Sequence, residues 1–514
     1  MTSDLAAPPV QAGSARPVSR RRRRGTVTVA VALAALLAYG TADALDEVPG
    51  ILTLTPAPAQ PLPQPTLVAA PAPAPGVAQL DPAAPVPQHV AALVDALAAD
   101  PRMTSGVPGQ PRPGTPGADA PQQNDAEPVD PTVGVAAQHS VPAGTPPAIL
   151  VLDAATGQVL GAAGEATPRI PASAQKVFTA AAVLTTRDPA ATLDTRALLG
   201  EDGTLTLVGG GDVLLGADAG NPAAVDGRAG IGDLARAAAA ALTARGITQV
   251  HLRLDDSLLP PPTPAPGLTP ADTRWVMPVQ PLALHTGLVD GARAGDPALQ
   301  AAAHFAAHLT AAGITVAGGP ERAAAPEGAQ EVARVASAPL ADVVRFAIKE
   351  SDNSVTELLG RLVAIDRGVT PDLAGATAAV TAVVAELGVD TAGVALADCS
   401  GLSPYNRTTV TALAQTMRLA AAPGHDGLVA LAADLPVAGL DGTLHNRLDG
   451  PAAGVARGKT GTLGAVTSLT GQVLDADGRV LVYAVIADGL PRGGVLGARA
   501  AIDSFVTALA GCGC

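Results

Sequence analysis

Lysine is almost absent from this sequence. The chain has 32 basic side chains, but only Lys176, Lys349 and Lys459 are lysines. Arginine keeps its proton in a protein, whereas a lysine amine that is removed from water can lose its proton and act as a general base. Lys176 and Lys459 each lie in a short motif with hydroxyl-bearing residues. The scarcity therefore indicates positions where an amine is needed for chemistry and not for charge alone.

Aromatic residues and cysteine are scarce as well. Aromatic side chains make up 2% of the chain, so a core must rely on alanine, valine and leucine. The three cysteines, Cys399, Cys512 and Cys514, suit an oxidising compartment. We expect one disulfide from Cys399 to the carboxy-terminal pair, which leaves one thiol over. No histidine has metal-ligand spacing to a cysteine, which disfavours a zinc site.

Two further features exclude classes of protein. The formal net charge is −14 although the first residues are rich in arginine, and such an acidic body argues against nucleic acid as a partner. The sequence has no G-x-S-x-G motif, which disfavours a serine hydrolase of the triad type. The run Gly209-Gly210-Gly211-Asp212 fits neither phosphate-loop pattern, so we interpret it as a tight turn.

The amino terminus has the pattern of an export signal. Arg20–Arg24 precede a short apolar run, Val27–Tyr39, which is followed by Ala42-Asp43-Ala44. A basic region, a short apolar core and an A-x-A-like site are typical of a secretory signal. The run is shorter than the roughly 20 residues that span a bilayer comfortably. We expect an extracytoplasmic protein, secreted or membrane-anchored, that meets the membrane only through this segment.

The first chemical motif is Ser173-Ala174-Gln175-Lys176. We expect a helix that opens at Pro171 and buries one face, because apolar residues from Val177 to Leu184 recur at helical spacing. Side chains three residues apart on a helix share a face, so the serine hydroxyl and the lysine amine are predicted to lie within hydrogen-bonding reach. In the first turn the helix dipole also favours negative charge that develops on the serine oxygen.

Two more motifs follow in the carboxy-terminal part. Ser351-Asp352-Asn353 is predicted in a turn between a helix over 341–350 and a second helix, which begins with a capping box, Ser354-Val355-Thr356-Glu357. Lys459-Thr460-Gly461-Thr462 is predicted at the edge of an antiparallel strand pair within 466–487. Each motif alone is weak. Ser-x-x-Lys, Ser-x-Asn and Lys-Thr-Gly in this order form the specific signature of β-lactamases and penicillin-binding proteins.

The three motifs resemble those of the penicillin-recognising serine acyltransferases. Other stretches resemble one branch, the low-molecular-mass class C penicillin-binding proteins, which are D-alanyl-D-alanine carboxypeptidases/endopeptidases. These stretches are Pro171-Ala172-Ser173, Gly209-Gly210-Gly211-Asp212, Leu254-Asp255-Asp256-Ser257 and Asp398-Cys399-Ser400-Gly401-Leu402-Ser403. That branch carries extra domains between its first two motifs, and the gap between Ser173 and Ser351 leaves room for them. Cys399 departs from the pattern, because many relatives have glycine there.

The resemblance implies a hydrolase that cleaves the D-alanyl-D-alanine bond of peptidoglycan stem peptides through an acyl-enzyme. β-Lactams would be covalent inhibitors, and neither a metal nor another cofactor would take part. Ser173 would be the nucleophile and Lys176 its base, with an amine kept neutral by burial and by the charge of Lys459. Ser351 would relay the proton to the leaving amine, and Asn353 would hold Lys176 and the substrate amide.

The resemblance also implies the substrate-binding residues. Lys459, Thr460 and Thr462 would bind the terminal carboxylate of a peptide or a β-lactam. The backbone N–H groups of Ser173 and Thr462 would form the oxyanion hole. The resemblance thus implies that Ser173, Lys176, Ser351, Asn353 and Lys459 are catalytic, and that Asp352, Thr460, Gly461 and Thr462 bind substrate.

The implied fold is α/β (α+β), with an antiparallel sheet flanked by helices, an all-helical subdomain and an inserted domain. A hairpin near 149–160 and the strand pair near 466–487 would belong to the sheet. The expected organisation is a basic tail and signal or anchor (1–45), a Pro/Ala-rich linker (46–86), a first catalytic part (87–198) with a disordered Pro-rich insertion (about 108–147), inserted accessory domains (199–334) and a second catalytic part (335–514).

Two other functions use the same residues. A secreted serine β-lactamase would share the acylation machinery, but typical β-lactamases lack an inserted block of this length; rapid turnover of a chromogenic cephalosporin would favour it. A non-catalytic penicillin sensor or wall-binding protein could keep the fold, and binding without hydrolysis would favour that alternative. The intact motifs favour the carboxypeptidase/endopeptidase.

Overall fold

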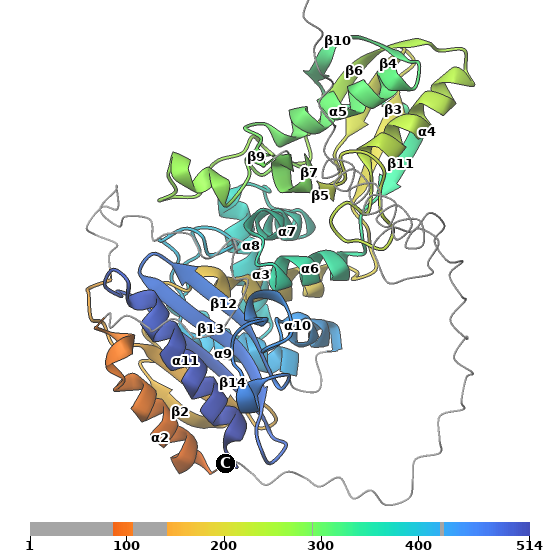
Figure 1. The fold of residues 1–514 in the computed structure, drawn as a ribbon. Coiled ribbons are helices and arrows are strands. Elements are labelled where there is room, and N and C mark those ends of the chain that lie inside the picture. Colours follow the sequence, from red (N-terminus) through yellow and green to blue (C-terminus); the bar gives the residue numbers. More distant parts are fainter. Residues whose placement is uncertain (1–85, 106–140, 290, 422–425, 514) are drawn as a thin grey trace, which may run out of the picture. The chain divides into compact units, whose positions relative to one another are not determined.

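The structure is a computed structural model that describes residues 86–105, 141–289, 291–421 and 426–513. The predicted signal, the Pro/Ala-rich linker and most of the predicted Pro-rich insertion lie outside the described residues. Within them, the chain forms two five-stranded sheets with helices packed against each (Figure 1). The predicted mixture of helices and sheets is confirmed.

The first sheet is antiparallel throughout. Alternate residues of its inner strands enter two different cores, as the two-residue period of a strand requires. Leu150 and Ala484 face one core, whereas Ile149 and Tyr483 face the other. In spatial order its strands are β12 (Ala456–Leu463), β13 (Val466–Leu474), β14 (Val480–Ala487), β1 (Ala148–Asp153) and β2 (Val159–Ala163).

Helices cover both faces of this sheet (Figure 1). Helix α9 (Val410–Ala421) packs on one face, and α2 (Pro87–Ala98) and α11 (Gly494–Gly511) pack on the other. Helix α2 buries Val90 and Val94 against the sheet. The strands β1 and β14 are therefore shielded from water on both sides, which explains their continuous apolar sequences.

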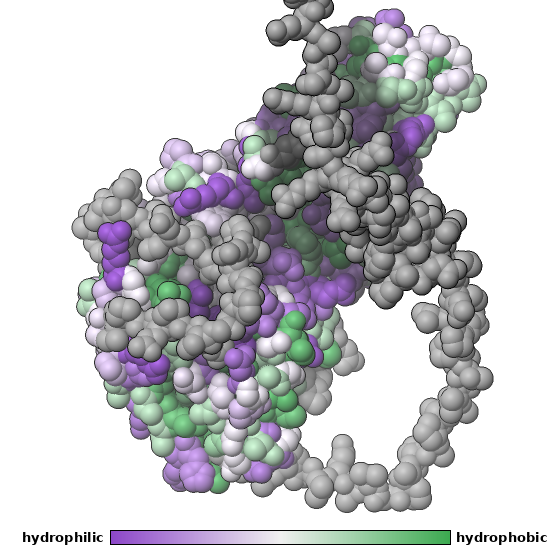
Figure 2. All heavy atoms as spheres, viewed as in Figure 1, coloured by the Kyte–Doolittle hydropathy of each residue, from purple (hydrophilic) through white to green (hydrophobic). Residues whose placement is uncertain are grey.

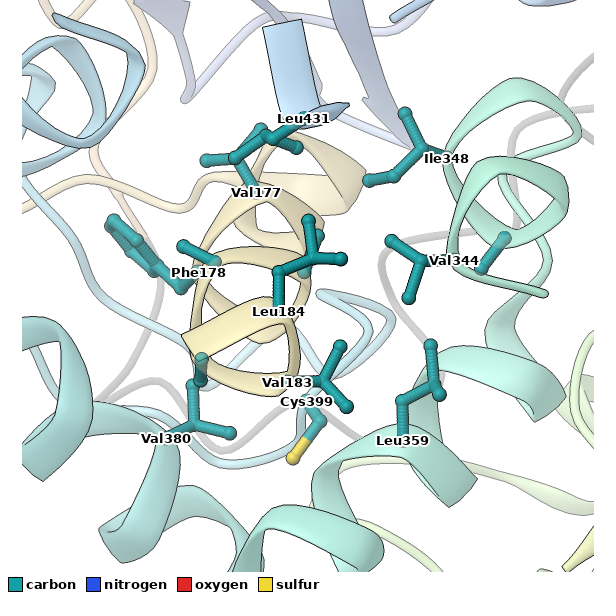
Figure 3. Packing of buried hydrophobic residues seen from close by; sticks show 14 of the residues in the cluster. Val177, Phe178, Val183, Leu184, Val344, Ile348, Leu359, Val380, Cys399 and Leu431 are labelled. Carbon is teal, nitrogen blue, oxygen red and sulfur yellow. The ribbon is translucent and has the colours of Figure 1, made fainter. Parts of the chain in front are cut away.

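Helix α3 (Lys176–Thr186) lies at the centre of the largest core (Figure 3). Phe178, Val183 and Leu184 each lose almost all contact with water, which contributes about 1.5–3 kcal/mol per side chain. Because Ala180, Ala181 and Ala182 of α3 have small side chains, neighbouring helices can approach it closely. These neighbours are α6 (Leu340–Lys349), α7 (Asn353–Asp366), α8 (Leu373–Glu386), α9 and α10 (Val429–Asp434).

Cys399 belongs to this core, and the expected disulfide from Cys399 is wrong. Its thiol is free and fully buried beside Val183 and Leu359 (Figure 3). It occupies space that Gly360 of α7 leaves open, since a Cβ at Gly360 would lie 2.3 Å from the Cys399 Sγ. Cys512 is disulfide-bonded without Cys399, and Cys514 lies outside the described residues.

The second sheet and its helices lie between the first two motifs in the chain. They enclose a separate core in which Leu207, Leu234 and Phe305 are completely buried. The spatial order is β10 (Thr315–Arg322), β6 (Gln249–Asp255), β4 (Thr204–Val208), β3 (Asp194–Leu199) and β11 (Gln330–Ala336). The covering helices are α4 (Ile231–Thr243) and α5 (Pro297–Ala311). Two short strand pairs lie in the same part of the chain: β5 (Asp212–Leu215) pairs with β7 (Leu282–Leu284), and β8 (Leu288–Val289) pairs with β9 (Ala292–Arg293).

Helix α11 is the one helix in the described part of the chain that is long and apolar enough to span a membrane. Its apolar residues, including Ile502, Phe505 and Leu509, are buried in the core between the sheet and α2. Where atoms are coloured in Figure 2, hydrophilic residues lie among the hydrophobic ones. The apolar composition of α11 is therefore accounted for by its packing inside the fold.

Candidate active site

Ser173 and Lys176 lie where a tight turn becomes α3. We expected an α-helix from Pro171, but Ala172–Gln175 form a 3-10 turn and the α-helix begins at Lys176. The reason is a close contact with the loop at Gly401: a Cβ there would lie 2.0 Å from the Ala172 carbonyl oxygen, and Ala172 has a left-handed φ of 47°. The predicted proximity is confirmed, because the Lys176 Nζ lies 2.9 Å from the Ser173 Oγ.

The second motif joins α6 to α7. Ser351 has a φ of 59°, a conformation that turns the chain sharply between the two helices. Asp352 is buried, and its Oδ1 accepts a hydrogen bond from the Val355 N–H as the N-cap of α7. The predicted capping box at Ser354–Glu357 is therefore wrong. The Ser354 Oγ accepts from the Met277 N–H instead, and Asn353 is the first residue of the helix.

The third motif lies within β12, the edge strand of the first sheet. Lys459 is completely buried, and its Nζ donates to the Ser351 Oγ at 2.8 Å. Gly461 lets the strand approach the serine turn, because a Cβ there would lie 2.7 Å from the Pro171 carbonyl oxygen. Thr460 donates to the Thr443 Oγ1 at 2.9 Å, so a neighbouring loop orients its side chain.

The Lys176 amine contacts three separate segments of the chain, those that contain Ser173, Asn353 and Ser400. Its Nζ lies 2.9 Å from the Ser173 Oγ, 2.6 Å from the Asn353 Oδ1 and 2.8 Å from the Ser400 carbonyl oxygen. The last two atoms can only accept hydrogen bonds. A neutral amine must therefore give both N–H groups to Asn353 and Ser400. Its lone pair is left pointing at Ser173, which can donate its hydroxyl proton.

The orientation of the Asn353 amide is fixed from the other side. Its Nδ2 donates to the Trp275 carbonyl oxygen at 3.0 Å, and a carbonyl oxygen cannot donate. The amide must therefore present its NH₂ to Trp275 and its oxygen to Lys176. Trp275 lies in the segment between β6 and β7. A residue that is far from the three motifs in the sequence therefore orients Asn353 at the centre of the site.

Burial controls the charge of both amines. Desolvation lowers the pKa of Lys176 to about 8, while the carboxylates of Asp398, Asp352 and Glu357 oppose this by raising the pKa. Desolvation lowers the pKa of Lys459 well below its ordinary value, and the charge of Lys176 lowers the pKa further. Burial is thus the largest cause of the lowered pKa of Lys176, as expected, and the nearby carboxylates limit how far that pKa falls.

Sequence reasoning missed two carbonyl groups of the site. The backbone oxygens of Trp275 and Ser400 have no side-chain signature, so motif analysis could not find them. For Ser400 a signal did exist, since the stretch from Asp398 to Ser403 resembles the class C branch but received no role. Among the described residues, no group of three or more histidine, cysteine or acidic side chains is placed to hold a metal ion.

A serine hydroxyl paired with a desolvated amine is an arrangement for nucleophilic acyl transfer. Comparison with known proteins agrees with this chemistry. The model of the D-Ala-D-Ala carboxypeptidase 3 (S13) family matches residues 134–292 and 291–509. The chain belongs to this family of serine peptidases. The predicted resemblance to class C penicillin-binding proteins and the predicted serine-type D-Ala-D-Ala carboxypeptidase are thereby confirmed.

Individual relatives support the same assignment. The chain is 38% identical over 383 residues to a carboxypeptidase of Mycobacterium tuberculosis, an alignment that covers 71% of this chain and 80% of the relative. It is 38% identical over 379 residues to the carboxypeptidase DacB of Mycolicibacterium smegmatis, with the same coverage. The crystal structure of penicillin binding protein 4 from Haemophilus influenzae matches with a TM-score of 0.59 and 21% identity, covering 70% of this chain and 96% of that chain. The last comparison shows a shared fold.

Proposed function

We propose that this protein removes D-alanine from peptidoglycan stem peptides through an acyl-enzyme on Ser173, and that β-lactams acylate the same serine. The observation that carries this proposal is the placement of the Lys176 Nζ within hydrogen-bond distance of two obligate acceptors, in Asn353 and Ser400, and of the Ser173 Oγ, so that in the neutral amine the lone pair faces the Ser173 hydroxyl. The H. influenzae protein of similar fold has also been solved in complex with a β-lactam.

In the proposed acylation, the Ser173 Oγ attacks the carbonyl carbon of the penultimate D-alanine, and its proton passes to the Lys176 Nζ. The C–N bond of the tetrahedral intermediate then breaks. Ser351 passes a proton to the leaving amine and is reprotonated by the Lys459 Nζ, which its hydroxyl contacts. The proton that Lys176 took from Ser173 replaces the one lost by Lys459, so Lys176 is neutral again when acylation ends. Water then attacks the ester with Lys176 again as base, and the serine hydroxyl is restored.

The proposed carboxylate site is the third motif. Lys459, Thr460 and Thr462 would bind the terminal carboxylate, and the backbone N–H groups of Ser173 and Thr462 would form the oxyanion hole, where one donor is typically worth about 3–4 kcal/mol. Burial of Lys459 disfavours its charge, so an incoming carboxylate would restore the protonated form. Asp352, also predicted to bind substrate, would act through the N-cap that it forms on α7.

Three proposals concern the chain as a whole. Action on cell-wall peptides places the enzyme outside the cytoplasm, and residues 1–45 would supply the export signal or the anchor. The second sheet and its helices would be the inserted accessory domain expected at 199–334. The flanking parts, 87–198 and 335–514, would together form the catalytic domain.

Covalent labelling tests the proposed nucleophile. The full chain is incubated with fluorescent penicillin, the adduct is mapped by mass spectrometry, and release of D-alanine from a stem pentapeptide is measured. We expect a label on Ser173 that is lost in Ser173→Ala and retained in Ser504→Ala, a matched variant on the exposed side of α11. A label that persists in Ser173→Ala would overturn the assignment.

The same samples separate the alternative functions. Release of D-alanine from monomeric pentapeptide reports carboxypeptidase activity, and cleavage of cross-linked dimers reports endopeptidase activity. Rapid turnover of a chromogenic cephalosporin would indicate a β-lactamase instead. A stable adduct with no peptide cleavage of either kind would indicate a penicillin-binding sensor.

A further inference from the structure

The Ser400 carbonyl that accepts from Lys176 lies in a loop held by two buried acids. The Asp398 Oδ1 accepts from the Gly401 N–H at 2.7 Å, which fixes the peptide unit that carries the Ser400 oxygen. The Glu357 Oε1 accepts from the N–H groups of Cys399 and Ser400 at 2.9 and 2.8 Å, which fixes the peptide units immediately before it. Both sides of the carbonyl are therefore held in place.

Glu357 comes from the same helix as Asn353. The two residues are one helical turn apart on α7, so their side chains share a face of that helix. Asn353 contacts the Lys176 amine directly, and Glu357 contacts the loop that supplies the other acceptor. One face of α7 thus controls both groups that receive the N–H groups of the amine.

Burial of the Glu357 carboxylate destabilises the folded protein unless its interactions compensate for the lost contact with water. The residue is 4% exposed, and its Oε2 has no hydrogen-bond partner among the described residues. A buried carboxylate with an unpaired oxygen destabilises a fold unless another interaction compensates. Arg361, one turn further along α7, supplies an attractive charge without a hydrogen bond to the carboxylate in the described structure.

We propose that Glu357 is a positioning residue for Lys176, which aims the amine through the Ser400 loop and whose negative charge helps the amine to hold its proton between turnovers. This inference rests on the proposed role of Lys176 as the base for Ser173. The predicted motifs do not include Glu357 among the residues of the site. Its contribution would be visible in how acylation depends on pH.

The sign of the pH effect follows from the charges around the amine. Burial, together with the charge of Asp398, raises the pKa of the Glu357 carboxyl to about 7, so Glu357 carries its negative charge above that pH. There it raises the pKa of Lys176, so removing its charge lowers that pKa and makes the neutral base available at lower pH. In Glu357→Gln the amide oxygen can still accept both N–H groups while the charge is lost. The charged or titratable groups that face Lys176 or Glu357 are Asp352, Asp398, Lys459, Arg361 and Cys399.

The experiment measures the second-order rate of acylation by fluorescent penicillin from pH 5 to 10, with the full chain and three variants. For Glu357→Gln we expect the acidic limb to move to lower pH by up to about one unit, most clearly above pH 7, where Glu357 carries its charge in the parent protein. For Glu357→Ala, which also frees the Ser400 loop, we expect the alkaline plateau to fall on the order of tenfold to a hundredfold. Glu386→Gln, an exposed glutamate on α8, is the matched control and should follow the parent profile.

The outcomes distinguish this inference from the proposed function. If the parent protein is not labelled on Ser173, the proposed function fails. If the parent is labelled with an acidic limb near pH 8 but the Glu357→Gln profile superimposes on it, the positioning role of Glu357 is overturned. Glu357→Gln keeps the test decisive if Glu357→Ala does not fold, which thermal unfolding of each variant will show.

Discussion

The two sheet-containing regions use charge in opposite ways. Around the first sheet and α3, ionisable side chains are buried and interact with one another, as Lys176 does with Lys459 and with Glu357. Around the second sheet, charged residues form pairs at the surface, as Arg236 does with Asp218 and Asp233. Surface pairs contribute little because water screens them, whereas buried groups interact strongly and change their pKa.

This difference shows how the second region serves the site mainly through its backbone, although the charge of Arg293 in β9 also acts on Asp352 and lowers the pKa of that carboxyl against the effect of burial. Its contributions to the site described above are backbone groups: the Trp275 carbonyl accepts from Asn353, and the Met277 N–H donates to Ser354. Backbone atoms are held by the chain itself, so they orient a partner without adding charge near Lys176. Reactivity therefore depends on the first region, and orientation depends on both.

The largest expected effect comes from disturbing the close contact inside the first region. In Gly401→Ala the new Cβ would lie 2.0 Å from the Ala172 carbonyl oxygen, at a φ of +84°. The turn that holds Ser173 must then shift, and we expect acylation by fluorescent penicillin to slow on the order of a hundredfold.

Gly478→Ala is the matched control for this substitution. Gly478, in the turn between β13 and β14, has nearly the same φ, +82°, but a Cβ added there would meet no atom within 4 Å. The variant should lose about 1 kcal/mol of stability from backbone strain and keep its acylation rate. Equal loss of rate in both variants would contradict the role given to the Gly401 contact.

The second effect concerns the buried amine. Because burial lowers the pKa of Lys176 to about 8, the neutral base is depleted below that pH. The second-order acylation rate should fall about tenfold per pH unit below the pKa and level off above it. An acylation rate that is constant from pH 5 to 8 would show that Lys176 is not the base. Burial of charged groups in the first region would then have no visible effect on the reaction.

A smaller effect is expected where the two regions meet. Ser354→Ala removes the acceptor of the Met277 N–H and leaves a buried donor unpaired, which should cost about 1–3 kcal/mol of unfolding free energy. The Trp275 carbonyl would be held less firmly, so acylation should slow several-fold. Urea unfolding measures the free energy of unfolding and labelling kinetics measure the acylation rate, with Ser504→Ala as control. An unchanged acylation rate despite lost stability would show that the Met277 contact does not affect the site.

The smallest effect is expected on the surface of the second region. Arg236→Ala breaks two exposed ion pairs on α4. Since such pairs are screened by water, thermal unfolding and the acylation profile should both match the parent protein. A clear change in the pH profile would mean that charge on the surface of α4 affects the site, which would contradict the contrast between the two regions.

Much of the first region could be predicted from sequence because local patterns encode it. The apolar run at Ile149 and the alternating pattern after Val466 predicted strands that the structure contains. The spacing of Ser173 and Lys176 predicted their contact, which depends on only one turn of chain. The start of α7 was mispredicted because Ser354 and Glu357, which could form a capping box, are bound by groups from Met277 and from the Ser400 loop.

The sequence by itself determined which residue types could perform acyl transfer: a chain with three lysines places two of them beside hydroxyl groups in a recognisable order. Only the tertiary structure decided where the Lys176 lone pair points and how readily the amine loses its proton. Those properties depend on the carbonyl oxygens of Ser400 and Trp275 and on burial. Backbone atoms are the same in every residue, and burial is a property of the whole fold, so neither can be identified from a motif.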